Sequence, residues 1–390
     1  MTEPMTTSLP TPTEFERLLT RFINGTLLGG KGTVDRDTRL FEDGYMNSLR
    51  ILDLIAMVEK TLGRRVPDRA VRLANFRSIA TIVQTFHPDA KEQAVSLSAD
   101  RVFERVGDRA RFASPLQALI RRGDVHVTAP GCVSLSGLAL DVFDAIDRTV
   151  IGWARALGAP EHRYPNLIEQ SVLERAGQQA STVISGQRES ARLAPAVCYH
   201  TYPEFSGRPI GEKPELITAR GQCYRYEGGQ HVPLERLWEF TMREIIVIGT
   251  RDQVETTRQS LVRQASALVE ALELDAVIET ASDPFFTAGD EGRRLMQQAG
   301  ALKYELRLAI DETGRTIAVA SFNHHHDFFG ARFDMRHATG VPAHSGCVAF
   351  GLERWVLALF AQHGVEPGSW PNAARTWLAD ARPRAHGGRS

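Results

Sequence analysis

The 390-residue sequence is poor in cysteine, and its few cysteines are scattered. Cys132, Cys198, Cys223 and Cys347 form no Cys-x-x-Cys pair, and no signal-peptide pattern precedes them. A disulfide framework is therefore excluded, and this usage is typical of a reducing compartment. We expect free thiols in a cytoplasmic protein.

Long apolar runs and an excess of one charge are missing as well. No run approaches the ~18 apolar residues that a membrane span needs, so we expect no membrane partner. Lys and Arg total 46 and Asp and Glu total 47, which gives a net charge of −1. That balance leaves no excess of basic residues of the kind that binds the phosphates of nucleic acid. What is present is a globular composition, 43% hydrophobic and 24% charged, in a chain long enough for two domains.

The first predicted domain covers residues 12–88. Apolar residues at helical spacing predict helices at 15–28, 49–62 and 76–86, within an all-α bundle of about four helices. Gly63 and Pro67 are expected to end the second helix, and Asn47 or Ser48 to cap its start. Residues 1–11 and the polar linker 89–99 are expected to lack regular structure.

Asn47-Ser48-Leu49 resembles the Asp-Ser-Leu motif of acyl carrier proteins, whose serine carries a 4′-phosphopantetheine arm. The flanking FEDG at 41–44 and VPD at 66–68 fit the same family. The resemblance implies that Ser48 is the attachment site. Asn47 in place of the usual Asp, and the lack of an acidic excess, depart from the family. The alternative is that Ser48 is a plain helix N-cap.

The second predicted domain covers residues 100–381, followed by a disordered tail at 382–390. Its class is α+β, a mostly antiparallel sheet flanked by helices, because strands and helices do not follow a βαβ alternation. Helices are expected at 139–157, 167–177, 251–272 and 352–360. Strands are expected at 197–202, 223–227, 239–248, 302–310, 317–322 and 346–350.

Two short motifs in this domain point to a nucleotide site. Arg225 and Glu227 lie two residues apart on a predicted strand and share a face, although such a pair alone is usually solvated. Gly-Leu-Glu-Arg at 351–354 opens a predicted helix and alone is usually helix surface. In this order the two resemble motifs 2 and 3 of class II aminoacyl-tRNA synthetases. FNHHHDFFGAR at 322–332 resembles the segment before motif 3 in seryl-tRNA synthetases.

The resemblance implies an ATP site in which Arg225 and Arg354 are catalytic. Arg225 would hold the α-phosphate, and Arg354 would clamp the γ-phosphate and one face of adenine. The other implied ATP contacts are Glu227 at the adenine amino group, Phe240 stacked on adenine, Arg236 near the outer phosphates, and Ser321.

One departure concerns magnesium. The family has Glu-x-x-Ser before motif 3, with the Glu on Mg²⁺, whereas Ala318 precedes Ser321 at that spacing here. Either Asp311 or Glu305 holds Mg²⁺ through water, or adenylation is weak.

Cys198, Glu244 and Cys347 are far apart in the sequence, and spacing alone favours three buried core residues. They stand, however, where the zinc-dependent branch of the family places its ligands. That branch includes atypical seryl-tRNA synthetases and short amino acid:[carrier protein] ligases. The resemblance implies Zn²⁺ with its fourth position open to the substrate amine, so that Glu244 also binds substrate. Asn323 is a second expected substrate contact, and the triplet 324–326 is expected to be exposed or substrate-facing.

The resemblance implies ATP-dependent activation of a small amino acid, glycine or alanine favoured, and its transfer to a carrier phosphopantetheine thiol. The carrier is this chain's own first domain or a separate protein. Phe285, Phe286 and Phe322 are expected to narrow the amino-acid pocket, and a homodimer is expected through 139–157. The alternatives are tRNA aminoacylation, against which the missing basic RNA-binding domain counts, and a catalytically weak carrier or interaction protein.

Overall fold

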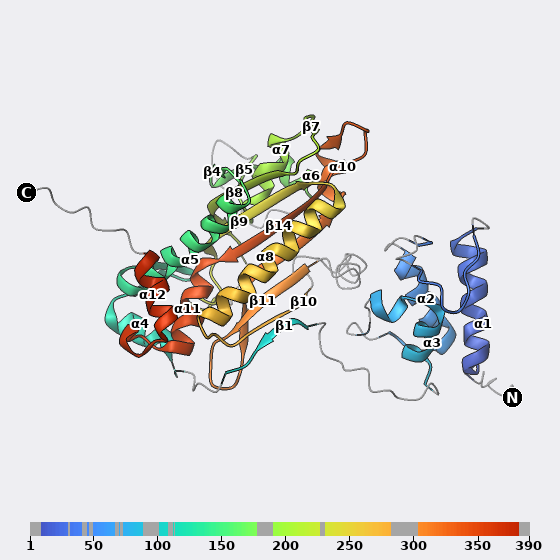
Figure 1. The fold of residues 1–390 in the computed structure, drawn as a ribbon, viewed down its shortest axis with the longest axis horizontal. Coiled ribbons are helices and arrows are strands. Elements are labelled where there is room, and N and C mark those ends of the chain that lie inside the picture. The colour runs from blue at the N-terminus through green and yellow to red at the C-terminus, as the bar shows by residue number, and fades with distance from the viewer. Residues whose placement is uncertain are drawn as a thin grey trace, which may run out of the picture. The chain divides into compact units, whose positions relative to one another are not determined.

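The computed structural model divides the chain into two compact units. Residues 1–101 with 280–303 form the first, and residues 102–279 with 304–390 form the second (Figure 1). The structure describes residues 9–29, 32–40, 45–46, 50–66, 70, 73–88, 101–107, 112, 114–177, 190–226, 231–281 and 303–381. Among them, no helix has the length and apolarity that crossing a membrane requires.

The first unit contains the helices α1 (Pro12–Phe22), α2 (Ile51–Leu62) and α3 (Ile79–Phe86). Thr11 caps α1 in a capping box with Glu14, and Gly63, at φ +63°, ends α2 as predicted. The chain starts α3 later than predicted because Leu73–Phe76 forms a separate 3₁₀ helix. The helices share an apolar core that includes Phe15, Leu19, Ile23, Leu54, Phe76, Ile79 and Ile82.

Several predictions for this unit remain without support. Its described residues contain three α-helices, so the four-helix carrier bundle is not confirmed. Asn47, Ser48 and the linker 89–99 lie outside the described residues.

The second unit is built on an eight-stranded sheet in the order β1-β10-β11-β12-β14-β9-β8-β4. The central pairs β12–β14, β14–β9 and β9–β8 are antiparallel, as predicted, and β4 joins β8 in parallel. The strands are β1 (Arg101–Arg105), β10 (Ala276–Thr280), β11 (Lys303–Ala309), β12 (Thr316–His326), β14 (His344–Gly351), β9 (Glu239–Gly249), β8 (Glu215–Tyr224) and β4 (Glu161–His162).

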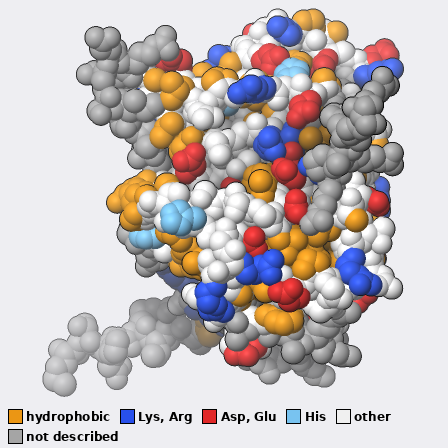
Figure 2. All heavy atoms as spheres, turned by 90° about the vertical axis from the view of Figure 1, so that its left-hand side faces the viewer, with side chains coloured by type: hydrophobic (Ala, Val, Ile, Leu, Met, Phe, Trp, Pro, Cys, Tyr) orange, Lys and Arg blue, Asp and Glu red, His pale blue; other side chains and the backbone are white. Residues whose placement is uncertain are grey.

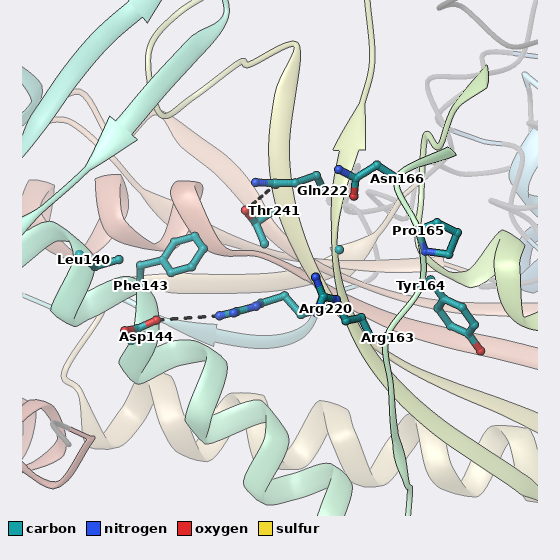
Figure 3. A pocket seen from close by; sticks show the side chains of 11 residues that line it. Leu140, Phe143, Asp144, Arg163, Tyr164, Pro165, Asn166, Arg220, Gln222 and Thr241 are labelled. Carbon is teal, nitrogen blue, oxygen red and sulfur yellow. Dashed lines mark hydrogen bonds and ion pairs between the residues drawn. The ribbon is translucent and has the colours of Figure 1, made fainter. Parts of the chain in front are cut away.

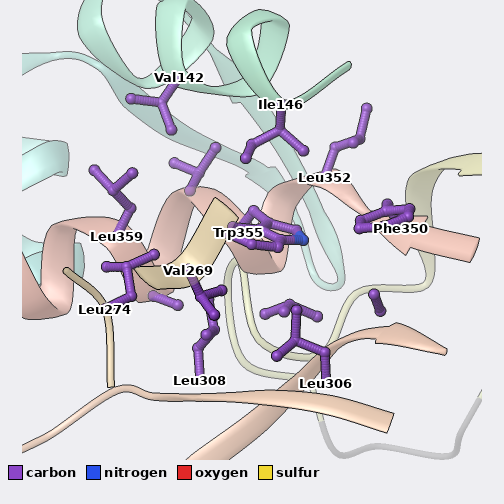
Figure 4. Packing of buried hydrophobic residues seen from close by; sticks show 14 of the residues in the cluster. Val142, Ile146, Val269, Leu274, Leu306, Leu308, Phe350, Leu352, Trp355 and Leu359 are labelled. Carbon is purple, nitrogen blue, oxygen red and sulfur yellow. The ribbon is translucent and has the colours of Figure 1, made fainter. Parts of the chain in front are cut away.

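Three long helices pack against this sheet through the largest core of the molecule. They are α5 (Gly137–Ala156), α8 (Arg251–Ala271) and α11 (Leu352–His363), all close to their predicted bounds. Trp355 of α11 is fully buried among Ile146 of α5, Val269 of α8 and Phe350 of β14 (Figure 4). Each such side chain contributes about 1.5–3 kcal/mol of burial free energy. These helices cover one face of the sheet, and a smaller apolar cluster that includes Tyr202, Ile246 and Phe329 covers part of the other.

One predicted element beside the site is wrong, and a second is only partly confirmed. The predicted strand 197–202 is a 3₁₀ helix, Cys198–His200, followed by α7 (Thr201–Glu204). The predicted helix 167–177 begins as β5 (Leu167–Glu169), which pairs with β6 (Ala191–Leu193), and only then forms α6 (Gln170–Arg175). In both places, backbone N–H and C=O groups pair with residues far away in the chain and not with the partners that the predicted element would have given them.

The remaining elements surround the sheet. They are α4 (Pro115–Arg122), β2 (Val125–Ala129), β3 (Cys132–Leu135), β7 (Pro209–Ile210), α10 (Phe328–Arg332), β13 (Arg336–His337) and α12 (Asn372–Ala381). On the face of the molecule seen in Figure 2, positive and negative side chains are interspersed, in keeping with the small net charge.

Candidate functional site

The strand register brings the predicted site residues onto one face of the sheet. Asn323 of β12 pairs with Cys347 of β14. Two positions along, Ser321 pairs with Ala349, which pairs in turn with Glu244 of β9. Side chains at every second position of a strand share a face, so these side chains lie together on the face that α5, α8 and α11 leave free.

Cys198, Glu244 and Cys347 meet on this face. One ligand atom from each lies within 4.8 Å of the others, and all three side chains are buried. Cys198 reaches the two strand residues from the 3₁₀ helix before α7. Within the described residues, no further group of three or more His, Cys, Asp or Glu side chains comes this close together.

The donor atoms of this cluster and their burial suit a metal ion. Glu244 is 1% exposed, and its two oxygens accept the backbone N–H groups of Val197 (2.9 Å) and Cys198 (3.2 Å). Burial raises the pKa of Glu244. A hydrogen bond to Cys347, together with burial, holds the pKa of the Cys198 thiol well above its usual value. Three acidic groups this close ionise together only beside a positive charge, and two sulfurs with one carboxylate suit zinc.

Asn323 and His325 lie against the sulfur of Cys347. Asn323 Nδ2 is 3.4 Å from the sulfur and 3.1 Å from Ser321 Oγ, and His325 Nε2 is 3.8 Å from the sulfur. Residue 325 follows Asn323 by two positions on β12, so both side chains leave the same face of the strand. This alternation is visible in the sequence.

Two expectations about neighbouring side chains are wrong. His324 is buried on the opposite face, where it contacts Glu255 (3.4 Å) and His344 (3.3 Å), so the triplet is not exposed as a whole. Phe322 points into the core beneath the helices and cannot narrow a pocket beside Glu244. Residues 285 and 286 lie outside the described residues.

Arg225 and Phe240 are neighbours at the end of the β8–β9 pair. The Arg225 guanidinium lies over the Phe240 ring, 5.1 Å from its centroid, and Nε donates to the carbonyl of Pro195 (2.9 Å). Arg225 directly follows β8, which ends at Tyr224 rather than at 227. Its predicted companion Glu227 lies outside the described residues.

Arg354 lies at the start of α11 and contacts two backbone carbonyls. Nε donates to Glu235 (2.8 Å) and Nη1 donates to Ala318 (3.0 Å). Arg236, next to Glu235 in the chain, is exposed. The contact with Ala318 places Arg354 beside the position at which the synthetase family has its magnesium carboxylate.

The two carboxylates considered as substitutes at that position are already paired. Glu305 contacts Arg307 (3.0 Å), and Asp311 contacts Arg315 (2.9 Å). Hydrogen bonds, chiefly from the Thr313 hydroxyl, lower the pKa of Asp311 to about 2. Asp311 is therefore an anion at neutral pH, with a guanidinium already beside it.

A cavity of about 700 Å³ lies elsewhere, between α5, the edge of β8 and residues 163–166. Asp144 and Arg220 face each other across it, and Gln222 contacts Thr241 (Figure 3). Neither Cys347 nor Arg354 lines this cavity. Arg220 and Gln222 leave β8 on the face opposite Glu244, so the cavity is separate from the cluster.

Comparisons with known proteins agree with this geometry. Residues 182–363 match the family model of the tRNA synthetase class II core domain (G, H, P, S and T). Amino acid--[acyl-carrier-protein] ligases 1 and 2 of Bradyrhizobium diazoefficiens are each 36% identical, over 187 and 191 residues. These matches cover 48% and 49% of this chain and 57% of each relative, so the chain spans little more than half of their length. Type-2 serine--tRNA ligase of Methanocaldococcus jannaschii is 35% identical over 46% of this chain and 35% of its own.

Solved structures show the same fold at low identity. The seryl-tRNA synthetase of M. kandleri, solved with a tRNASec of A. aeolicus, superposes with a TM-score of 0.62 and 22% identity over 81% of this chain and 71% of its own. The seryl-tRNA synthetase of Pyrococcus horikoshii, solved with ATP, gives a TM-score of 0.54 and 15% identity over 70% of this chain and 64% of its own.

Proposed function

We propose that this chain, which carries a class II synthetase-like ligase domain, uses ATP to activate a small amino acid and transfers it to the phosphopantetheine thiol of a carrier protein. The observation that carries the proposal is the buried cluster of Cys198, Glu244 and Cys347, which lies on the same face of the sheet as Asn323. Arg225 and Arg354 lie at motif positions of the same domain. The two ligase relatives support this reaction type over the alternatives.

The chemistry has two balanced steps. A carboxylate oxygen of the amino acid attacks the α-phosphorus of ATP, and the bond to pyrophosphate breaks, which leaves an aminoacyl-adenylate. The thiol sulfur then attacks the carbonyl carbon, AMP leaves, and the thiol proton passes to water. Arg225 stabilises the charge that develops on the α-phosphate, and Arg354 binds the γ-phosphate and one face of adenine. Phe240 supplies a flat surface for adenine.

Cys198, Glu244 and Cys347 are the residues that would hold zinc. When bound, zinc accepts a neutral amine and so fixes the direction of the substrate carboxylate. The two backbone N–H groups on Glu244 keep its carboxylate in place for that purpose. Glycine or alanine is the proposed substrate: the buried rings of Tyr202 and Phe329, whose centroids are 4.1 Å apart, lie in the same apolar cluster as Cys198 and Cys347, which supports a small side chain.

The carrier and the assembly complete the proposal. Ser48 is the proposed phosphopantetheine site, loaded in cis, or else a separate carrier protein receives the amino acid. A homodimer through the α5 side of the second unit is also proposed, on the precedent of two-fold oligomers.

Intact mass on the full chain tests the proposal. The chain is co-expressed with a phosphopantetheinyl transferase and given Mg·ATP with glycine, alanine and serine. We expect a pantetheine adduct that Ser48→Ala loses, and an ATP-dependent aminoacyl increment that Arg225→Ala loses. If the chain gains the pantetheine adduct but neither the chain nor an added carrier protein gains an aminoacyl increment, the ligase assignment is wrong.

Zinc is tested separately by metal analysis. Cys198→Ala and Cys347→Ala should each lose bound zinc, while Cys223→Ala, an equally buried thiol on β8, should keep it. Equal zinc content in all three variants would remove the metal from the proposal.

A further inference from the structure

The sulfur of Cys347 has two side-chain nitrogens beside it that the proposed chemistry does not use. Asn323 Nδ2 lies 3.4 Å away and His325 Nε2 lies 3.8 Å away, both within reach of N–H···S hydrogen bonds. We infer that His325 and Asn323 are positioning residues, which hold the Cys347 thiolate in the orientation that binds the metal. The inference rests on the metal site of the proposed function.

The backbone is shaped to bring both nitrogens to the sulfur. Asn323 is directly opposite Cys347 across the β12–β14 ladder. The register then shifts between His324 and His326, and His326 has a φ of +53°, which is rare for a residue with a side chain. Such bulges commonly re-aim a side chain next to a functional site. Here the irregularity lies at the residue whose ring faces the sulfur.

His325 is itself held from its other nitrogen. Nδ1 lies 3.3 Å from the Tyr202 hydroxyl and 3.3 Å from the Ser345 hydroxyl, and both of these residues are fully buried. The ring also packs edge-on against Phe329 at 4.9 Å. A hydroxyl that donates to Nδ1 leaves the proton of a neutral imidazole on Nε2, which then donates to the sulfur. Tyr202, Ser345 and Phe329 thus fix the rotation of the ring, and we assign it the tautomer that is protonated at Nε2.

The two strand ligands then have equivalent support. Glu244 accepts two N–H groups from the backbone of residues 197 and 198, and the sulfur of Cys347 has Asn323 Nδ2 and His325 Nε2 in position to donate to it. The same Nδ2 also lies 3.2 Å from the carbonyl oxygen of Cys347. Donors of this kind orient a metal ligand and disperse part of its negative charge. His325 does not itself belong to the group of ligand atoms within 4.8 Å of one another, so the geometry assigns it to the support rather than to the metal. Asn323, predicted to bind substrate, is assigned first to the sulfur.

Zinc affinity tests the inference, measured by competition with a chromogenic chelator on the full-length chain. We expect His325→Leu and Asn323→Leu each to weaken zinc binding about 10- to 100-fold, the usual cost of losing such a contact. His325→Gln, whose amide can donate near the Nε2 position, should recover most of the affinity. His337→Leu on β13 is the matched control and should bind like the wild type.

Cobalt substitution supplies a second readout that loss of packing would not reproduce. Without its N–H donors the thiolate is a stronger electron donor, so its charge-transfer band should move to longer wavelength in His325→Leu and return in His325→Gln. Wild-type affinity with an unmoved band would overturn the inference. So would X-ray absorption showing imidazole bound to zinc. Should His325→Leu fail to fold, Asn323→Leu carries the same test. Retention of zinc by Cys347→Ala would instead overturn the proposed metal site.

Discussion

Arg354 donates a hydrogen bond from Nη1 to the backbone carbonyl of Ala318, at 3.0 Å. The contact ties the start of α11 to β12 at the position where the family places a magnesium-binding carboxylate. A methyl group stands there instead, and Glu305 and Asp311 are already paired with arginines. Both of the described carboxylates considered for magnesium here therefore already have a guanidinium partner.

Ala318→Glu should lower the Mg²⁺ concentration that gives half-maximal ATP–pyrophosphate exchange. A carboxylate at this position adds a hard oxygen ligand of the type Mg²⁺ prefers. Ala318→Gln has the same length without the charge and should leave the Mg²⁺ requirement unchanged. If both variants behave alike, position 318 has no part in magnesium binding.

Arg225→Lys should slow ATP–pyrophosphate exchange by about 10²–10³-fold, as the loss of a preorganised transition-state donor does. The planar guanidinium lies over Phe240 while donating to Pro195, and an ammonium cannot do both. Arg220→Lys, which lies on β8 and faces α5, is the control and should keep its rate. Equal rates for the two variants would remove Arg225 from the catalytic step.

The parts of the fold that the sequence predicted are those with a local signal. The helices at 139–157 and 251–272 and the strand at 239–248 have strong periodicity and begin and end close to where it indicates. Residues 197–202 are equally apolar, yet they form helical turns because Glu244, far away in the chain, accepts the N–H groups of Val197 and Cys198. A contact of that kind cannot be read from local sequence.

The candidate site likewise combines residues that the sequence indicates with contacts that depend on distant parts of the chain. The family resemblance points to Cys198, Glu244 and Cys347, and their meeting depends on the register of two strands, β9 and β14, and on one helical turn. Alternation along β12 places residue 325 on the face of Asn323, but only the β12–β14 pairing shows that Cys347 lies opposite Asn323 on that face. Phe322 alternates with Asn323 along the same strand, so it faces the core and cannot narrow the pocket.

Glu353→Gln should change how stability depends on pH. Burial raises the pKa of Glu353 to about 7, and its oxygens accept the N–H of Thr241. Because the folded state holds this proton more tightly than the unfolded state, the stability from protonated Glu353 is complete below about pH 4.5. It is lost as pH rises through 7. The wild type should therefore lose up to about 3 kcal/mol relative to Glu353→Gln across that window.

Urea unfolding at a series of pH values, followed by tryptophan fluorescence, measures this difference. All five tryptophans lie in the second unit, so the signal reports on the unit that contains Glu353. Parallel pH profiles for the two proteins would show that Glu353 titrates normally in the folded state.

Trp355→Ala should destabilise the second unit by about 3–5 kcal/mol, because it empties the centre of the main core. Trp355 is fully buried and stacks on Phe350 with centroids 6.4 Å apart. Among the described residues its Nε1 has no hydrogen-bond partner, so Trp355→Phe removes an unsatisfied donor while keeping an aromatic ring. The Phe variant should lose much less in the same unfolding experiment. Equal losses of stability in the Ala and Phe variants would mean that a phenyl ring does not restore the packing of the larger indole ring.

Arg243→Met should destabilise the second unit by about 3–5 kcal/mol, because it leaves a buried carboxylate without its main partner. Arg243 is 1% exposed, and it reaches Asp147 of α5 at 2.6 Å and Glu161 of β4 at 2.9 Å. Arg220→Met, which removes the other, largely exposed arginine from Asp147, is the control and should cost no more than about 1 kcal/mol.

The double variant Arg243→Met/Asp147→Leu separates an uncompensated charge from lost packing. If the cost of Arg243→Met is the stranded Asp147 carboxylate, replacing both partners with apolar side chains should recover most of the stability, as for other buried ion pairs. If the double variant is no more stable than the single one, the Arg243 side chain acts through its packing between α5 and the sheet. Because this pair joins α5 to β9 on the face opposite Glu244, zinc content should stay at the wild-type level in the double variant. Loss of zinc there would show that the two faces of β9 are coupled.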